Sequence, residues 1–470
     1  MSIDYKDLPG PKGSLLFGNL FQFSLSTLHQ YLEHQARTYG DVFRIRMGPG
    51  KFTAVANPDL VQQILKARPY SFRRMRKMDH ILRQEGVHGL FNAEGDDWKV
   101  HRRIINKGLN IRHQKQYFTS IIKSVERLFR KMNLAASNNL PYAVQDDLKR
   151  FTVDVTTSLA FGFEMNTLEQ KGGVIQTHME KIFPMIFKRI NDPIPLHKFF
   201  KTKSDKAYDR AFKEIEKQVE IYIESGKQRL KDDPKRNDAP QDILEALLTA
   251  SLEEEAISNK EIKGNLLTLL LAGEDTTAHS LAWALYWLCQ YPEIQDKLQR
   301  EADSVLGNEA YLTTYDAHEA LTYTSAVIHE TLRLKSVAPL LLLEPLEDVE
   351  ISEYFFRKGA KMILLTRYGA LLEDNFTDSK TFQPERWLDT KESRCPVHNL
   401  TAIMPFGAGP RMCPGKHLAL LEMKLVLSMI ARNFTVELIT PVDLIQENLA
   451  FTMMPNTFTL KLAPRLTSRA

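Results

Sequence analysis

The chain has 470 residues, and its 62 Lys and Arg against 58 Asp and Glu leave a net charge of +4. With 43% hydrophobic and 26% charged residues it has the composition of a globular protein, which excludes a disordered, collagen-like or coiled-coil chain. So small a positive charge gives no reason to expect nucleic-acid binding, which needs a basic stripe on one face.

The cysteines and the beginning of the chain indicate the compartment. Cys289, Cys395 and Cys413 are too few and too scattered for a disulfide framework, which favours a reducing compartment. The charged N-terminal segment is broken by Pro9 and Pro11, so it does not fit a signal peptide or a membrane anchor. We therefore expect a cytoplasmic protein with no transmembrane anchor.

The first predicted elements are strands, and helices follow. The runs Val42–Met47 and Phe52–Ala56 flank a Gly-Pro-Gly sequence, which predicts a β-hairpin. The helical pattern begins at Pro58, and Asp96-Asp97 marks the start of a further helix. From about 115 to 335 almost every segment has the helical period.

Strand-like segments return later in the chain. Short strands and turns lead into a long irregular stretch, a helix follows Pro414 to about Arg432, and TFTLKL near the end alternates like a strand. These patterns predict a single domain, 1–470, that is mainly α with a minor β-sheet region. Its β-rich parts are expected at about 1–60 and 345–400, and its helical core at about 95–335 and 414–432.

The segment FGAGPRMCPG, Phe406–Gly415, carries the strongest chemical signal. Its glycines allow the backbone N–H groups to converge near Cys413. We expect Pro414 at the first position of the following helix, where the helix dipole favours a thiolate at Cys413. A lone thiolate with hydrogen bonds around its sulfur suits a metal that a cofactor carries. For an isolated cysteine a buried structural role is more frequent, but the Phe, Gly and Arg at fixed offsets favour the functional one.

This segment resembles the haem-binding signature FxxGxRxCxG of the cytochrome P-450 superfamily. The resemblance implies a triangular prism of helices around a buried haem b (iron protoporphyrin IX), with Cys413 as the iron ligand. The residues that it assigns to cofactor binding are Trp98, Arg102, Ala272, Phe406, Gly407, Arg411, Cys413 and Gly415.

A second motif, AGEDTT, lies in a helix that is apolar on nearly every side and is therefore predicted to be central. Gly273 in its middle is unfavourable for a helix and predicts a kink or groove. An acid such as Asp275 is costly there without a task or a partner, and the residues alone leave a structural and a functional role equally open. The resemblance implies that Asp275 and Thr276 relay protons during oxygen activation.

Two further motifs concern structure and cofactor contact. Glu330 and Arg333 are spaced to face the same side of a helix, a pair that is usually exposed and worth little. The resemblance implies that Arg386 joins them in a buried structural network. Trp98 and Arg102 share one helix face, and the resemblance implies that Arg102 and Arg411 contact haem propionates.

The chain departs from the family pattern at two places. Leu343 and Glu344 occupy a strand where many relatives carry an arginine for one propionate. We expect that propionate to be held from the basic cluster 73–77 or by water. Lys335-Ser336 replaces the common aromatic-Pro step, which leaves the local shape of the pocket open.

The resemblance places a substrate pocket among apolar segments. Each residue by itself is more often ordinary core, but together they show no charged anchor, which favours a hydrophobic substrate. The expected lining residues are Leu90, Phe91, Phe187, Thr268, Leu271, Val337, Ala338, Leu340, Met453 and Met454.

The resemblance implies a haem-thiolate monooxygenase that hydroxylates or epoxidises a hydrophobic substrate with one atom of O2. We expect a monomer that takes electrons from a ferredoxin- or flavodoxin-type donor and its NAD(P)H reductase. A peroxide-driven peroxygenase and a non-catalytic haem-binding sensor or carrier are the alternatives. The pair Asp275-Thr276 argues against the peroxygenase, and a sensor would leave that pair unexplained.

Overall fold

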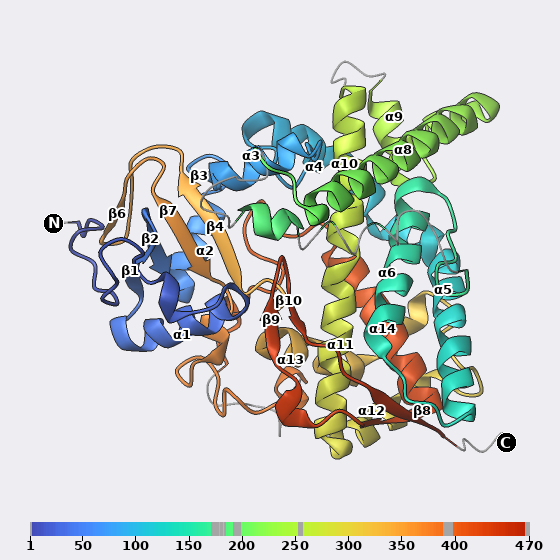
Figure 1. The fold of residues 1–470 in the computed structure, drawn as a ribbon. Helices are drawn as coiled ribbons and strands as arrows, with labels where there is room; N and C mark the ends of the chain where they lie inside the picture. The colour runs from blue at the N-terminus through green and yellow to red at the C-terminus, as the bar shows by residue number, and fades with distance from the viewer. Residues whose placement is uncertain are drawn as a thin grey trace.

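A computed structural model describes residues 2–170, 178, 182, 185–190, 199–251, 257–388 and 398–465. The strands of the main sheet gather with helices α1 and α2 on one side of the molecule, and the long helices make up the other side (Figure 1). One large core cluster extends through both sides, and a second, smaller cluster fills the space beneath the main sheet. The fold class, mainly α with small sheets, is as predicted.

The main sheet joins segments that are far apart in the chain. Its five strands lie in the order β1 (Val42–Met47), β2 (Gly50–Val55), β7 (Lys361–Leu365), β4 (Leu340–Pro345) and β3 (Phe72–Arg74). The pair β1–β2 is antiparallel, with Val42 opposite Val55 and Met47 opposite Gly50, which confirms the predicted hairpin. Strand β2 pairs with β7 in parallel, and β4 pairs antiparallel with both β7 and β3.

Three two-stranded sheets complete the β structure. They pair β5 (Val349–Ile351) with β6 (Tyr354–Phe356), β8 (Phe434–Leu438) with β11 (Leu460–Pro464), and β9 (Glu447–Leu449) with β10 (Met453–Pro455). Strand β11 contains the end of the predicted TFTLKL strand. The second strand-rich part occupies 340–365, so it begins earlier than the expected 345 and ends well before 400 in the described residues.

Thirteen α-helices are defined within the described ranges. They are α1 (Leu28–Tyr39), α2 (Pro58–Lys66), α3 (Arg76–Gln84), α4 (Gly95–Gly108), α5 (Ile111–Ser137), α6 (Val144–Phe161), α8 (Lys203–Asp232), α9 (Ile243–Ala250), α10 (Asn259–Gly273), α11 (Asp275–Gln290), α12 (Pro292–Leu306), α13 (Thr322–Leu334) and α14 (Lys416–Asn433). Local sequence explains several starts. Asn57 caps α2 with Pro58 in its first turn, and Ser258 with Glu261 forms a capping box for α10.

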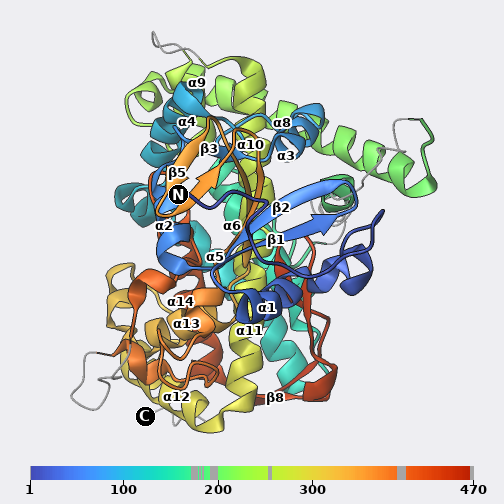
Figure 2. The same ribbon diagram turned by 90° about the vertical axis from the view of Figure 1, so that its left-hand side faces the viewer.

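Helices α10 and α11 form the predicted central helix, which runs through the middle of the molecule in Figure 1 and lies behind the strands in Figure 2. The helix is interrupted at Glu274 (φ −72°, ψ −71°), which confirms the predicted kink. Gly273 is required for close packing, because a Cβ there would lie 2.3 Å from Thr156 Oγ1 of α6. The break thus occurs beside a close approach of the central helix to α6.

Two expectations about the compartment can be compared with the structure. Cys289 and Cys413 carry free thiols, and Cys395 lies outside the described residues. Among the helices of the described ranges, none combines the length and the apolar character needed to cross a membrane.

Candidate functional site

The loop Phe406–Gly415 folds back on itself and holds Cys413 by its backbone. Cys413 N–H donates to the Phe406 carbonyl at 2.9 Å, and Gly407 N–H donates to Met404 O at 3.0 Å. Gly409 has φ +68°, and a Cβ there would lie 2.6 Å from the carbonyl oxygen of Leu65, so only glycine fits. The loop therefore packs directly against the end of α2.

The start of α14 differs from the prediction. The helix begins at Lys416 with Gly415 as its N-cap, so Pro414 precedes the helix instead of occupying its first position. Proline has no N–H, and the N–H groups of Gly415 and Lys416 are the ones that bond to Cys413. The cysteine still precedes the helix N-terminus, but the helix begins two residues later than expected.

The Cys413 side chain is accessible although protein atoms surround it. Its side chain has accessible surface, yet burial raises the pKa of the thiol; the N–H groups of Gly415 and Lys416 and the charge of Arg102 oppose that rise. The accessible surface and the raised pKa are compatible when the sulfur faces an open space inside the molecule. Within the described residues no three His, Cys, Asp or Glu side chains form a metal site, so a metal at Cys413 would take its other ligands from a cofactor.

The central helix also presents accessible surface in the interior. Ala272 is exposed and Thr276 is half-buried, although Leu270 and Ala278 around them are buried. Thr276 Oγ1 donates to the Ala272 carbonyl, four residues back, at 2.9 Å. Helix α11 packs against α14, the helix that follows Cys413, so the two accessible surfaces belong to neighbouring elements.

Asp275 has two basic neighbours. Its Oδ1 lies 3.4 Å from Lys149 Nζ of α6 and 3.5 Å from His279 Nε2, one turn along α11. Burial lowers the pKa of His279 to about 4, so the imidazole is neutral near pH 7. Its Nδ1 lies 3.0 Å from Thr452 Oγ1. Lys149 is therefore the charged partner that compensates this carboxylate.

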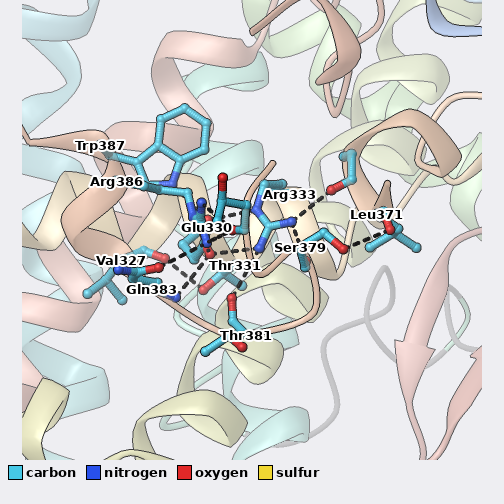
Figure 3. A network of polar contacts seen from close by, with 12 residues as sticks. Val327, Glu330, Thr331, Arg333, Leu371, Ser379, Thr381, Gln383, Arg386 and Trp387 are labelled. Carbon is cyan, nitrogen blue, oxygen red and sulfur yellow. Dashed lines mark hydrogen bonds and ion pairs between the residues drawn. The ribbon is translucent and has the colours of Figure 1, made fainter. Parts of the chain in front are cut away.

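Glu330 forms the centre of a buried network (Figure 3). Arg333 donates to both of its carboxylate oxygens, at 2.9 and 2.8 Å, and Arg386 Nε donates to Oε1 at 3.0 Å. Arg333 Nη1 also donates to the carbonyls of Ala370 and Ser379. The three predicted residues are thus brought together.

The sequence analysis missed one member of this network. Trp387 Nε1 donates to Glu330 Oε2 at 2.9 Å, and the Gln383 N–H donates to Oε1. The tryptophan directly follows Arg386 in the sequence Pro384-Glu385-Arg386-Trp387, and this adjacency was the available signal.

Three predicted cofactor contacts meet beside the cysteine loop. Arg102 Nη1 donates to the Met412 carbonyl at 2.7 Å, and the Arg411 guanidinium lies over the Trp98 ring at 5.3 Å. Arg411 also forms an ion pair with Glu94, which the sequence analysis did not consider. Helix α4 is thereby fixed to the loop by both of its predicted residues.

The chain matches the family described as Cytochrome P450 over residues 8–462. The chain belongs to the cytochrome P450 family. Human (Homo sapiens) cytochrome P450 3A5 is 28% identical over 441 residues, which cover 91% of this chain and 85% of that relative. The Arabidopsis thaliana protein LUTEIN DEFICIENT 5, chloroplastic, is 27% identical over 449 residues, covering 93% of this chain and 73% of the relative.

Two further comparisons concern the fold and the electron supply. The crystal structure of the cytochrome P450DA heme domain has a TM-score of 0.84 at 24% identity and covers 99% of this chain and 98% of that one. A bifunctional cytochrome P450/NADPH–P450 reductase of Gibberella moniliformis is 25% identical over 485 residues, covering 99% of this chain and 41% of the relative. This cytochrome P450 is a monooxygenase whose cofactor is haem.

The residues beside Arg411 fit a group with two carboxylates. Arg68 is 3% exposed, and its Nε and Nη2 have no hydrogen-bond partner. Arg74 and Arg411 adjoin it, and Glu94 is the carboxylate among them. Two positive charges of this cluster remain without a carboxylate, which suits the propionates of haem. Sequence analysis considered the 73–77 cluster but had no signal for Arg68.

The two departures from the family pattern occupy distinct places. Leu343 is buried in β4 opposite Arg74 of β3, and the neighbouring Glu344 pairs with Arg73 at 2.7 Å. Lys335 Nζ donates to Glu447 Oε1 of β9 at 2.6 Å and lies over the Trp283 ring. Lys335 therefore ties the end of α13 to the β9–β10 sheet.

The predicted pocket residues come from five segments, some of which are in contact. Met453 N–H donates to the Val337 carbonyl at 2.8 Å, and Leu90 N–H donates to Asn265 Oδ1 of α10 at 2.9 Å. Met453 is fully buried, so Met454 is the half-exposed member of that pair. The other half-buried side chains in the set are those of Phe91, Phe187, Leu271, Ala338 and Leu340.

Proposed function

We propose that this cytochrome P450 inserts one atom of O2 into a C–H or C=C bond of a hydrophobic organic molecule, with electrons from a separate donor. The observation that carries the proposal is the Cys413 loop, which holds a single thiol by backbone N–H groups beside accessible space. Haem bound there would supply the oxygen chemistry, with Cys413 as its protein ligand.

The side chains around the loop would hold and orient the haem. Arg102 fixes the Met412 carbonyl next to the ligand, and Arg411, stacked over Trp98, would contact a propionate. Phe406, Gly407 and Gly415 shape the backbone that surrounds the sulfur, and Ala272 faces accessible space on the central helix. Glu330, Arg333 and Arg386 would keep this loop region in place without touching the reacting atoms.

Asp275 and Thr276 would move protons. The Thr276 hydroxyl donates to Ala272 O, which leaves its oxygen free to accept a further hydrogen bond. Lys149 lies next to Asp275 and is partly exposed, so it offers a connection between this carboxylate and the solvent. His279, neutral near pH 7, would orient the carboxylate.

The substrate would be an apolar molecule bound among the predicted pocket residues other than Met453, which is fully buried. Most of their side chains are hydrophobic, and the hydroxyl of Thr268 is already used by the Gly264 carbonyl. Burial of apolar surface favours binding in a pocket of this kind, which offers no charged anchor.

A separate electron donor of ferredoxin or flavodoxin type, with an NAD(P)H reductase, would complete the system. The NADPH–P450 reductase named in the Gibberella moniliformis relative supports electron transfer from a reductase. We further propose that the protein is a cytoplasmic monomer formed by one domain over residues 1–470.

The test of the ligand is spectroscopic. Wild-type protein should show the red-shifted Soret band of a thiolate-bound haem after reduction in the presence of CO, and Cys413→Ser should abolish that band. Cys289→Ser serves as the matched control and should retain it. A red-shifted band in the Cys413→Ser protein would refute the ligand assignment.

A second test concerns the monooxygenase reaction itself. Hydrophobic compounds that shift the haem spin state should be turned over with a ferredoxin system, and Thr276→Ala should divert most reducing equivalents into hydrogen peroxide. Thr277→Ala changes a side chain on another face of the helix and is the control. Turnover with peroxide alone at the same rate would favour the peroxygenase, and spin-state shifts without any product would favour the sensor or carrier.

A further inference from the structure

The hairpin of strands β9 and β10 is fixed to the rest of the molecule at its base. Glu447 of β9 lies opposite Pro455 of β10, and its carboxylate is nearly buried. This carboxylate accepts hydrogen bonds from Lys335 at 2.6 Å and from Arg367 at 2.9 Å, and His29 Nε2 lies 2.7 Å from it. The three partners stand at the end of α13, in the turn after β7 and on α1. Charged contacts with three other segments therefore hold the hairpin in place.

The turn of this hairpin reaches the central helix. Thr452 lies between the two strands, and its Oγ1 is 3.0 Å from His279 Nδ1 of α11. Both side chains are buried. The next residue, Met453, donates its N–H to the Val337 carbonyl at 2.8 Å, so the same turn adjoins the segments of the predicted pocket. A turn beside the expected pocket thus contacts the helix that carries Asp275.

His279 connects the turn to Asp275. Its second ring nitrogen, Nε2, lies 3.5 Å from Asp275 Oδ1. Burial lowers the pKa of His279 to about 4; the charge of Asp275 opposes this effect, and the charge of Lys149 on α6 adds to it. The imidazole is therefore neutral near pH 7 and carries its hydrogen on one of the two nitrogens only.

The two neighbours of the ring decide which nitrogen carries the hydrogen. A carboxylate only accepts hydrogen bonds, so a bare Nε2 would direct a lone pair at Asp275 Oδ1. The hydrogen is therefore expected on Nε2, which leaves Nδ1 as an acceptor. The Thr452 hydroxyl can donate to it. Without that hydroxyl the same tautomer would contain a buried acceptor with no donor, which is unfavourable.

We propose that Thr452 is a positioning residue of the proton relay, because its hydroxyl donates to His279 Nδ1 and so keeps the Nε2–H directed at Asp275. The inference rests on the proposed function, in which Asp275 moves protons. It joins the relay to the turn beside the substrate pocket. The contacts of Glu447 hold the hairpin that carries this turn, so the hydroxyl has a fixed place beside the imidazole.

The first experiment determines the tautomer directly. Nuclear magnetic resonance of isotope-labelled histidine is recorded on the reduced, CO-bound holoprotein, and the signals missing from His279→Leu identify the ring. Wild type and Thr452→Ser should show a protonated Nε2 and a hydrogen-bonded, unprotonated Nδ1. Thr452→Val should shift the Nδ1 signal to that of an unbonded nitrogen or change the tautomer. A protonated Nδ1 in wild type, or unchanged ring signals in Thr452→Val, would overturn the proposal.

The second experiment measures the relay in the holoprotein with a ferredoxin system and n-octane as the apolar probe. Thr452→Val should raise the ratio of O2 released as hydrogen peroxide to O2 reduced further by about fivefold, the effect of one lost hydrogen bond. The half-saturating n-octane concentration should not change, and Thr452→Ser should restore the wild-type ratio. Thr157→Val is the matched control, since it removes a buried hydroxyl that bonds within α6. Equal ratios in Thr452→Val and Thr157→Val would refute the positioning role.

A double variant shows whether Thr452 acts through His279. When Thr452→Val is added to His279→Leu, the ratio should change by less than about twofold, because the connection is already broken. A further change of about fivefold would assign the effect to the pocket wall and contradict the proposal. Failure of the proposed function gives a different result: wild type would then lack a thiolate-type spectrum, while the spectra of the haem-free protein would still report the tautomer of His279.

Discussion

The Glu330 network and the group that Glu94 forms with Arg68, Arg74 and Arg411, here called the Glu94 cluster, both collect arginines around one carboxylate. The two groups complete the hydrogen bonds of their arginines differently. Around Glu330, Arg333 and Arg386 are bonded to the carboxylate and to backbone carbonyls. Around Glu94, Arg68 keeps two nitrogens without a partner. A satisfied network stabilises a fold, whereas an incomplete one leaves binding capacity for a ligand.

We expect the largest change in the free energy of unfolding when the Glu330 network loses its carboxylate. Glu330→Gln leaves two fully buried guanidiniums without their carboxylate, so the free energy of unfolding should fall by about 3–5 kcal/mol. Urea unfolding of the haem-free protein would measure it. A loss below about 1 kcal/mol would show that the carbonyl bonds alone hold the two arginines.

Removal of one charged group from the Glu94 cluster should change the free energy of unfolding in the opposite direction. Arg68→Met removes a buried guanidinium, two nitrogens of which have no hydrogen-bond partner, and keeps an apolar side chain of similar length. We therefore expect the free energy of unfolding of the haem-free protein to rise by about 1 kcal/mol. A loss as large as that of Glu330→Gln, in the same urea experiment, would erase the distinction between the two clusters.

Trp387→Phe gives a smaller perturbation of the complete network. It removes one indole donor from Glu330 Oε2 and keeps most of the ring. The expected loss is about 1 kcal/mol, because the carboxylate retains its other donors. Thermal unfolding of the holoprotein would show it as a small drop in Tm, and an unchanged Tm would mean that Arg333 alone satisfies this oxygen.

Glu422 on α14 is a third buried carboxyl group. Its burial raises its pKa well above the usual range. A raised pKa in the folded state means that its stabilising contribution is complete below the unfolded pKa and is lost as the pH rises. Glu422→Gln should therefore equal wild type in stability near about pH 4 and exceed it increasingly toward about pH 8. A parallel pH dependence in both proteins would contradict the raised pKa.

Much of the architecture could be predicted because it depends on local pattern. The hairpin β1–β2 follows from alternation around a Gly-Pro-Gly turn, and the helix start at Pro58 follows from its cap. The break in the central helix follows from Gly273 within AGEDTT. The position of Pro414 was predicted wrongly, because the hydrogen bonds of the cysteine loop, and not helix propensity, decide where α14 begins.

The candidate site likewise contains residues that the sequence identifies and residues that only the structure brings together. Cys413, Arg411, Glu330 and Arg333 stand in motifs whose spacing is visible along the chain, so the sequence alone identifies them. Arg68 and Glu94 stand in no such motif, and their meeting depends on how the end of α2, strand β3 and the start of α4 pack around the loop.

Residue types and spacing thus determined the family, the cysteine loop and the central helix, because those features are encoded within short segments. Only the tertiary structure decided which arginines are satisfied and which are left with unused donors. The reason is physical: the state of a buried charge depends on every group within a few ångströms, whichever part of the chain supplies it.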